Sequence, residues 1–206
     1  MGLLADKVAI IAGGTSGIGA RIAEVFLAEG ARLTIASPMR EEGEALARRL
    51  GAGVRFHYSD VSCEADVQSL IESTVADTGR LDVMVNNAGI AGHFASIARL
   101  DLEQYERTLA VVLKGVMLGT KHAARIMLPR GAGSIINTGS VAGSRAGFGP
   151  YDYSAAKAAV IHFTRCAAVE LGEHGVRANS ISPGGIATGI FGKAMQLDQD
   201  AIARSD

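Results

Sequence analysis

Cysteine is scarce in this chain. The 206 residues include only Cys63 and Cys166, which form neither a disulfide framework nor a Cys-x-x-Cys motif. We therefore expect two free thiols, buried or partly buried, in a cytoplasmic protein. The five histidines also lack the spacing of zinc ligands, so the sequence predicts no metal site.

Tryptophan is absent, and long apolar runs are missing as well. No run approaches the roughly 18 residues that predict a membrane span, and the first residues lack the pattern of a signal peptide. The net charge is −1, without the basic stripe that is typical of nucleic-acid binding. Because 48% of the residues are hydrophobic and 20% are charged, the composition favours one domain over residues 1–206 with a sizeable core.

Glycine, in contrast, is abundant, with 26 residues. An apolar run at 7–12 predicts a buried strand, and a glycine-rich turn at 13–19 leads from it into a helical pattern. Strand, glycine turn and helix together are the context in which a dinucleotide pyrophosphate binds at a helix N-terminus. The spacing is G-x-x-x-G-x-G, on Gly13, Gly17 and Gly19. A glycine-rich turn without a ligand is the alternative.

Strand and helix patterns alternate along the whole chain. This alternation predicts an α/β fold, a doubly wound parallel sheet of the Rossmann type, with ligands at the carboxyl ends of the strands. We expect strands near 7–12, 32–36, 54–58, 82–86, 133–138 and 176–182. We expect helices near 17–29, 41–50, 64–78, 101–128 and 152–173, the fourth of them capped by Asp101.

Tyr153 and Lys157 are four residues apart, so they lie one turn from each other on the same side of the last predicted helix. An ammonium beside a phenol favours the phenolate and lowers the pKa of the phenol, which then can act as a general acid or base. The hydroxyl of Ser140 can bind the oxygen of a carbonyl or alcohol. By itself, a Tyr-x-x-x-Lys pair also occurs by chance on solvated helices.

In this order, these motifs resemble those of the short-chain dehydrogenase/reductase family, from about residue 5 to about residue 192. The resemblance implies an oxidoreductase that interconverts a secondary alcohol, or a cyclic diol, and a ketone. The matching motifs are the glycine turn, Asp60-Val61, Asn86-Asn87-Ala88-Gly89, Ser140, Tyr153 with Lys157, and residues 183–188.

The resemblance also implies the residues of the site. Tyr153 exchanges a proton with the substrate oxygen, Lys157 lowers the pKa of the phenol and binds the cofactor ribose, and Ser140 orients the reacting oxygen. The implied contacts of NAD(P) are Gly13, Thr15, Ser16, Gly17, Ile18, Gly19, Ser37, Arg40, Asp60, Val61, Asn87, Ala88, Gly89, Tyr153, Lys157, Pro183, Gly184, Ile186 and Thr188.

Three of these motifs have ordinary structural alternatives. Asp60 can be a surface N-cap of the next helix rather than a neighbour of the adenine. Asn86-Asn87 can be a simple turn, and Pro183-Gly184 likewise. The residues His93, Phe94, Ile190 and Phe191 are candidates for the substrate pocket, or they belong to ordinary packing.

The sequence departs from the family pattern in three places. Val112 stands where the family usually has an asparagine, which leaves a triad in place of a tetrad. Ser37 stands where NAD-preferring members carry an acid, and Arg40 follows it, which slightly favours NADP. Arg40 can equally be a solvated residue at the helix start. The chain also ends early, either because the native chain is short or because it is a fragment, so we expect a truncated substrate lid at 184–206 and no seventh strand. The sixth strand should then be an exposed edge unless another chain covers it.

For partners, the resemblance implies a small-molecule substrate, and a homodimer or homotetramer formed through the helices at 101–128 and 152–173. No nucleic-acid or membrane partner is expected. A second function stays open, namely a non-catalytic dinucleotide-binding sensor or assembly subunit. The joint presence of Ser140, Tyr153 and Lys157 argues against it.

Overall fold

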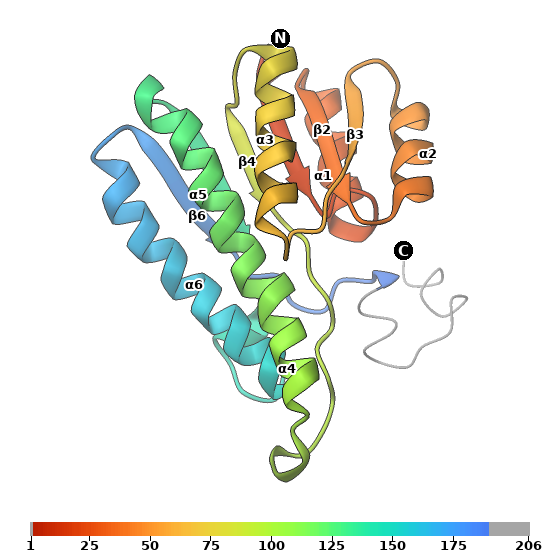
Figure 1. Cartoon of the computed structure of the whole chain (residues 1–206), viewed down its shortest axis with the longest axis vertical. Coiled ribbons are helices and arrows are strands. Elements are labelled where there is room, and N and C mark those ends of the chain that lie inside the picture. Colours follow the sequence, from red (N-terminus) through yellow and green to blue (C-terminus); the bar gives the residue numbers. More distant parts are fainter. Residues whose placement is uncertain (1, 190–206) are drawn as a thin grey trace.

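A single parallel sheet forms the centre of the computed structural model, which describes residues 2–189 (Figure 1). Its strand order is β3-β2-β1-β4-β5-β6, and every neighbouring pair is parallel. The order reverses between β1 and β4, as in a doubly wound fold. The strands are β1 (Val8–Ala12), β2 (Arg32–Ser37), β3 (Val54–Tyr58), β4 (Val83–Asn86), β5 (Gly133–Thr138) and β6 (Val176–Ile181). The predicted fold class is thereby confirmed.

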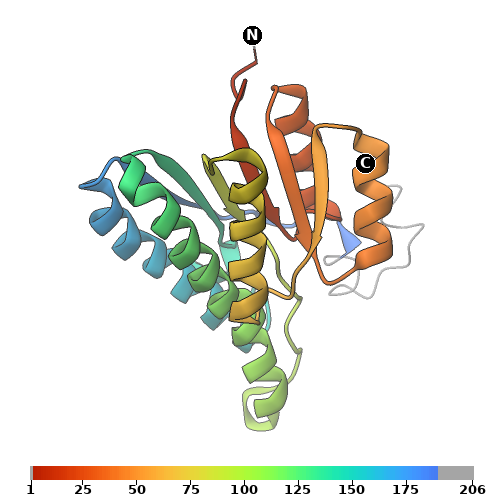
Figure 2. The ribbon, with the colours of Figure 1, turned by 45° about the horizontal axis from the view of Figure 1, so that its top comes forward.

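Helices cover both faces of this sheet. Apolar residues of α1 and α2 pack on one face, and those of α3, α5 and α6 pack on the other. In both views α5 and α6 lie side by side, and α4 projects past the end where the strands finish (Figures 1 and 2). The helices are α1 (Gly17–Ala28), α2 (Arg40–Leu50), α3 (Glu64–Thr78), α4 (Leu102–Leu109), α5 (Gly115–Met127) and α6 (Tyr151–Gly172).

The long helix predicted near 101–128 is interrupted in the structure. A π-helical segment, η2 (Ala110–Lys114), joins α4 to α5 and holds Val112 fully buried. Such a turn accommodates one extra residue, and apolar periodicity alone does not reveal it. The predicted start is correct, because the Asp101 carboxylate accepts the N–H groups of Glu103 and Gln104. Short 3-10 helices lie at η1 (Ile97–Arg99), η3 (Leu128–Arg130) and η4 (Val141–Gly143).

Two expectations concerning the surface have opposite outcomes. The prediction that the cysteines are buried or partly buried is wrong, because Cys63 precedes α3 and Cys166 lies on the outer face of α6, and both are exposed and free. The expectation for the sixth strand is correct, since β6 forms an edge of the described sheet. Its side chains alternate, with Val176 and Ala178 buried and Arg177 and Asn179 exposed.

Among residues 2–189, no helix has the length and apolar character needed to cross a membrane. Of the predicted lid at 184–206, the structure describes only 184–189. The pocket candidates Ile190 and Phe191 therefore lie outside the described residues.

A line of buried side-chain hydrogen bonds crosses the middle of the sheet. Asn86 on β4 donates to Asn137 on β5 at 2.8 Å, and Asn137 donates to Thr164 on α6 at 2.9 Å. A longer contact of 3.4 Å joins Asn86 to Thr120 on α5. All four side chains are at least 96% buried, so each amide depends on these partners to replace water.

We expect Asn137→Ala to lower the free energy of unfolding by about 1–3 kcal/mol, because buried groups on Asn86 and Thr164 lose their partner. Urea unfolding followed by circular dichroism measures this loss. Asn179→Ala on the exposed face of β6 is the matched control and should change stability by less than about 0.5 kcal/mol. Equal losses in the two variants would contradict the role of the buried line.

Candidate active site

The glycine turn brings the N-terminus of α1 very close to the end of β1. Gly13 and Gly17 have positive φ angles of 73° and 50°, which favour glycine. A Cβ atom on Gly19 would lie 1.9 Å from the carbonyl oxygen of Gly13, so no larger residue fits there. Ser16 is the N-cap of α1, and its side chain makes no capping hydrogen bond. Free backbone N–H groups at the start of α1 therefore face the turn, as binding of a phosphate requires.

Asn87 connects this turn to the neighbouring strands. Its side-chain nitrogen donates to the carbonyl oxygen of Gly13 at 3.1 Å, and its side-chain oxygen accepts from the Thr138 hydroxyl at 3.3 Å. Ala88 lies so close that a Cβ on Gly13 would come within 2.6 Å of its Cα. The ends of β1, β4 and β5 are thus fastened together, and Asn87 does more than form a simple turn.

Lys157, on α6, binds the same Thr138 that contacts Asn87. Its ammonium donates to the carbonyl oxygen of Thr138 at 2.6 Å, and the residue is only 3% exposed. Burial lowers the pKa of Lys157 to about 8, because the charged form loses its hydration. The nitrogen also lies 5.5 Å from the centre of the Tyr153 ring. The helical spacing that the sequence indicated therefore brings the two side chains together.

Ser140 completes the group. It is the N-cap of η4, its hydroxyl oxygen accepts the N–H of Ala142 at 3.1 Å, and its side chain hydrogen-bonds Tyr153. A Cβ on Gly143 would come within 2.6 Å of the Lys157 backbone, so η4 packs directly on α6. The structure thus brings the three predicted residues to one place, Ser140 from the start of η4 and Tyr153 and Lys157 from α6.

The predicted direction of the Tyr153 pKa is wrong. Burial raises the pKa of Tyr153, and the hydrogen bond from Ser140 only partly offsets this rise. The Lys157 ammonium is directed to the carbonyl of Thr138 instead of the phenol oxygen. Tyr153 is therefore a protonated phenol at neutral pH, able to donate a proton.

Residues 183–188 lie between this group and the glycine turn. The carbonyl of Pro183 accepts the N–H of Val141 at 3.0 Å. The Thr188 side chain would lie 3.1 Å from a Cβ on Gly17, so it contacts the start of α1. Gly184 approaches the Val141 side chain, and Ile186 is 46% exposed. This segment is therefore more than an isolated Pro-Gly turn.

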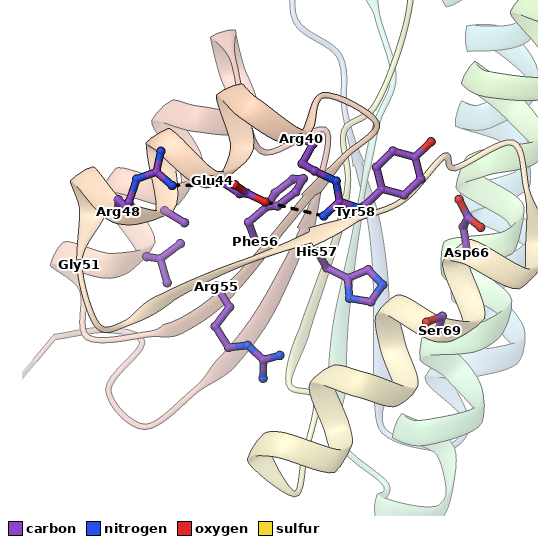
Figure 3. A pocket seen from close by; sticks show the side chains of 12 residues that line it. Arg40, Glu44, Arg48, Gly51, Arg55, Phe56, His57, Tyr58, Asp66 and Ser69 are labelled. Carbon is purple, nitrogen blue, oxygen red and sulfur yellow. Dashed lines mark ion pairs between the residues drawn. The ribbon is translucent and has the colours of Figure 1, made fainter.

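The end of β2 lies beside an arginine and a tyrosine. Ser37 is buried, and its hydroxyl oxygen accepts the N–H of Met39 at 3.0 Å. Arg40 begins α2, pairs with Glu44 at 3.7 Å and lies over the Tyr58 ring at 5.3 Å (Figure 3). Its side chain is 63% exposed, as the solvated alternative expects, and contact of Arg40 with a 2′-phosphate stays a prediction.

Arg40 and Tyr58 also line a groove of about 880 Å³ between α2, β3 and α3 (Figure 3). Ser140, Tyr153 and Lys157 are not part of its lining. The groove holds arginine and histidine side chains next to Glu44 and Asp66, and several of these already form ion pairs. It therefore lies apart from the three predicted catalytic residues, and of the predicted cofactor contacts only Arg40 lines it.

Asp60 and Val61 follow β3. The Asp60 carboxylate accepts the N–H and the hydroxyl of Ser62, at 2.8 and 2.7 Å. Helix α3 begins after Cys63, so Asp60 is not its N-cap and that alternative is wrong. Val61 belongs to the apolar core and contacts the position of Gly115. Contact of this pair with an adenine stays a prediction.

Two residues of the site were not found from the sequence. Thr138 contributes a carbonyl to Lys157 and a hydroxyl to Asn87, and only its place at the end of a predicted strand could have indicated it. Asp152 is buried beside Tyr153, where an acid next to a catalytic motif was the available signal. The pocket candidates His93 and Phe94 lie on the loop after β4 with exposed side chains.

This chain is similar in sequence and in structure to several known proteins. Residues 7–198 match the family model described as short chain dehydrogenase. Momilactone A synthase of Oryza sativa subsp. japonica is 45% identical over 97% of this chain and 73% of its own length. (+)-Borneol dehydrogenase 2 of Salvia officinalis is 41% identical over 91% and 67%. The crystal structure of levodione reductase has a TM-score of 0.91 and 35% identity, and the match covers 98% of this chain and 81% of that one.

The buried ammonium makes stability depend on pH. Folding lowers the pKa of Lys157 to about 8, whereas an unfolded lysine titrates near 10.4. Between about pH 8 and pH 10 the unfolded chain binds more protons, so the free energy of unfolding rises with pH by up to about 1.4 kcal/mol per unit from this residue. We expect Lys157→Met to lack this rise in urea unfolding at pH 7 to 9.5.

Lys7→Met, at an exposed lysine, is the matched control and should keep the pH dependence of the original chain. If the free energy of unfolding changed with pH in the same way in the original chain and in Lys157→Met, burial would not lower the pKa of Lys157 and the prediction would be wrong.

Proposed function

This chain belongs to the short-chain dehydrogenase/reductase family, and from that membership we propose that it interconverts a secondary alcohol and a ketone with Ser140, Tyr153 and Lys157 as its catalytic residues. It is an NAD(P)-dependent oxidoreductase that acts on CH–OH groups. The observation that carries the assignment of residues is the meeting of a buried ammonium, a half-buried phenol and a serine hydroxyl beside the glycine turn.

The described residues fit a dinucleotide. The glycine turn leaves room that a Cβ would fill, and free N–H groups at α1 suit the pyrophosphate. Asn87, Ala88 and Gly89 follow β4 at the same edge, and Thr188 faces the turn from the other side. When bound, NAD(P) supplies the redox chemistry, which is hydride transfer to or from the carbon that bears the oxygen.

The chain itself handles the proton. Because burial raises its pKa, Tyr153 holds its proton at neutral pH and donates it to the ketone oxygen during reduction. The Ser140 hydroxyl donates to the same oxygen and limits the charge that develops there. Lys157 is held by the Thr138 carbonyl near the ring and favours the phenolate that remains.

Val112 leaves this site without the fourth polar side chain that is usual in the family. Its side chain is fully buried within η2 and can neither donate nor accept a hydrogen bond. A triad accordingly carries the proposed reaction, and none of its three members depends on Val112 for a hydrogen bond.

For the substrate, we propose a cyclic secondary alcohol or its ketone. The names of two relatives refer to borneol and levodione, which are ring compounds with an alcohol or ketone group. An oligomer formed through the outer faces of α5 and α6 stays a prediction. It is supported by Met117 and Val169, which expose 41% and 73% of their surface on these helices.

We also propose that the cofactor is NADP. The last residue of β2 is Ser37 where an acid would favour NAD, and its hydroxyl accepts the backbone N–H of Met39. A 2′-phosphate would meet no carboxylate from this residue, and Arg40 starts α2 three residues further on. Tyr58 and Glu44 keep the guanidinium at this end of the helix.

We expect Tyr153→Phe to lower kcat/KM for cyclic ketones by roughly 10²- to 10⁴-fold, because the substitution removes only the proton donor. The loss is measured as consumption of NADPH or NADH at 340 nm. Cofactor binding, measured by fluorescence titration, should change little. Tyr151→Phe, on the exposed tyrosine two residues earlier, is the matched control and should keep full activity.

If Tyr153→Phe turned over as fast as the original chain, the proposed mechanism would be wrong. If both proteins bound cofactor and neither turned over any ketone, the non-catalytic sensor or assembly subunit would gain support.

For the cofactor, we expect kcat/KM to be at least about 10-fold higher with NADPH than with NADH, and Ser37→Asp to reverse this preference through repulsion of the 2′-phosphate. Arg40→Ala should raise the KM for NADPH alone. Arg48→Ala is its control, since Arg48 also pairs with Glu44 but lies two turns further along α2. A preference of the original chain for NADH would contradict the proposal.

A further inference from the structure

Asp152 is a buried carboxylate next to the proposed catalytic tyrosine. It lies in the first turn of α6 and is only 1% exposed. One oxygen accepts the backbone N–H of His93 at 3.0 Å and the hydroxyl of Thr108 at 2.7 Å. The other oxygen accepts the backbone N–H of Tyr153 at 2.8 Å.

These three donors come from three different segments. His93 lies on the loop that leaves β4, Thr108 lies on α4, and Tyr153 lies on α6. The hydroxyl of Thr108 is itself buried, at 1% exposure. One side chain therefore joins the loop, α4 and the first turn of α6.

The buried carboxylate of Asp152 is stabilised by hydrogen-bond donors, and not by a neighbouring cation within the described part of the chain. None of the ion pairs found in residues 2–189 includes Asp152. Removing a carboxylate from water is costly unless donors replace the water, and here three donors and the N-terminus of α6 do so. An apolar residue would make the same packing contacts without that cost, so the carboxylate has a role that packing alone does not explain.

The loop also packs directly on the base of the tyrosine. Gly92 has a φ of 76°, and a Cβ at this position would lie 2.7 Å from Asp152 Oδ1 and 2.9 Å from the Cβ of Tyr153. The backbone at Gly92 and His93 therefore packs on Asp152 and Tyr153 in the first turn of α6. A shift of this loop would move the wall beside the phenol.

We infer that Asp152 is a positioning residue for the proposed reaction: it locks the loop after β4 to the helix that carries Tyr153. The inference rests on the proposed function, because the phenol must be the proton donor for its placement to affect turnover. Asp152 acts through Tyr153 and the loop, and it does not touch the reacting atoms. Productive geometry in such sites tolerates little displacement, and a shift of about 1 Å can cost about 100-fold in rate.

The test uses the full chain and the nearly isosteric Asp152→Asn. The amide has one acceptor oxygen, so its NH₂ group must face either the Tyr153 N–H or the two donors from His93 and Thr108. We expect kcat/KM for a cyclic ketone to fall about 10- to 100-fold, with most of the loss in kcat. The dissociation constant for NADPH should change less than about 2-fold, because the glycine turn is not part of this group.

Two further variants sharpen the comparison. Thr108→Val removes one donor and keeps the carboxylate, so its loss of kcat/KM should be smaller, about 2- to 10-fold. Asp101→Asn is the matched control at an exposed N-cap, where asparagine caps as well as aspartate, and it should leave kcat/KM and stability unchanged.

Hydrogen–deuterium exchange followed by mass spectrometry provides a readout that does not need turnover. In Asp152→Asn, peptides covering residues 88–100 should exchange faster, while those covering residues 7–30 should not change. If Asp152→Asn and Thr108→Val lost thermal stability but kept full kcat/KM and unchanged exchange at 88–100, the role would be structural only and the inference would be overturned.

Failure of the proposed function looks different. In that case the original chain would not turn over ketones, or Tyr153→Phe would match it, whatever the result at Asp152. The lock itself would then be judged by exchange alone, and unchanged exchange at 88–100 in Asp152→Asn would overturn it.

Discussion

One line of hydrogen bonds holds the glycine turn, where we propose that the cofactor binds, in register with the proposed catalytic residues. It runs from the carbonyl of Gly13 through Asn87 and Thr138 to the ammonium of Lys157. The bonds join different elements, so they tie the ends of β1, β4 and β5 to the second turn of α6. The bond of Lys157 is buried and the two bonds of Asn87 are partly buried, so loss of Lys157 or of its acceptor would leave a buried group unsatisfied. The glycine turn and Tyr153 therefore keep a fixed spacing before any ligand binds.

Burial shapes the chemistry of this line as much as its geometry. It lowers the pKa of Lys157 and raises that of Tyr153, since each charged form loses hydration. In the free protein both groups thus move toward their neutral forms. Hydrogen bonds from Ser140 to the phenol, and from the ammonium to Thr138, oppose this trend, and the balance leaves a proton available on the phenol near neutral pH.

Most of the fold was predictable because its signals are local. Strand β1 is a continuous apolar run, and its predicted range differs from the observed one by a single residue. The placement of Tyr153 and Lys157 followed from helical spacing. In contrast, the direction of the Tyr153 pKa shift depends on burial by segments that are distant in the sequence. The partners of Asp152 were not predictable either, because two of them are backbone N–H groups and His93 lies 59 residues away. The π-helical segment at 110–114 has no signature in apolar periodicity, so it was also missed.

The length of that segment determines how α4 is rotated relative to α5. A regular helix turns by about 100° per residue, so the one extra residue that a π-turn accommodates sets how α4 is rotated about its axis relative to α5. Shortening 110–114 by one residue would swing Thr108 away from Asp152, while α5 and the sheet beneath it stayed in place. An insertion or deletion at this single point would therefore change how α4 meets the first turn of α6, while the glycine turn at the other end of the sequence stayed as it is.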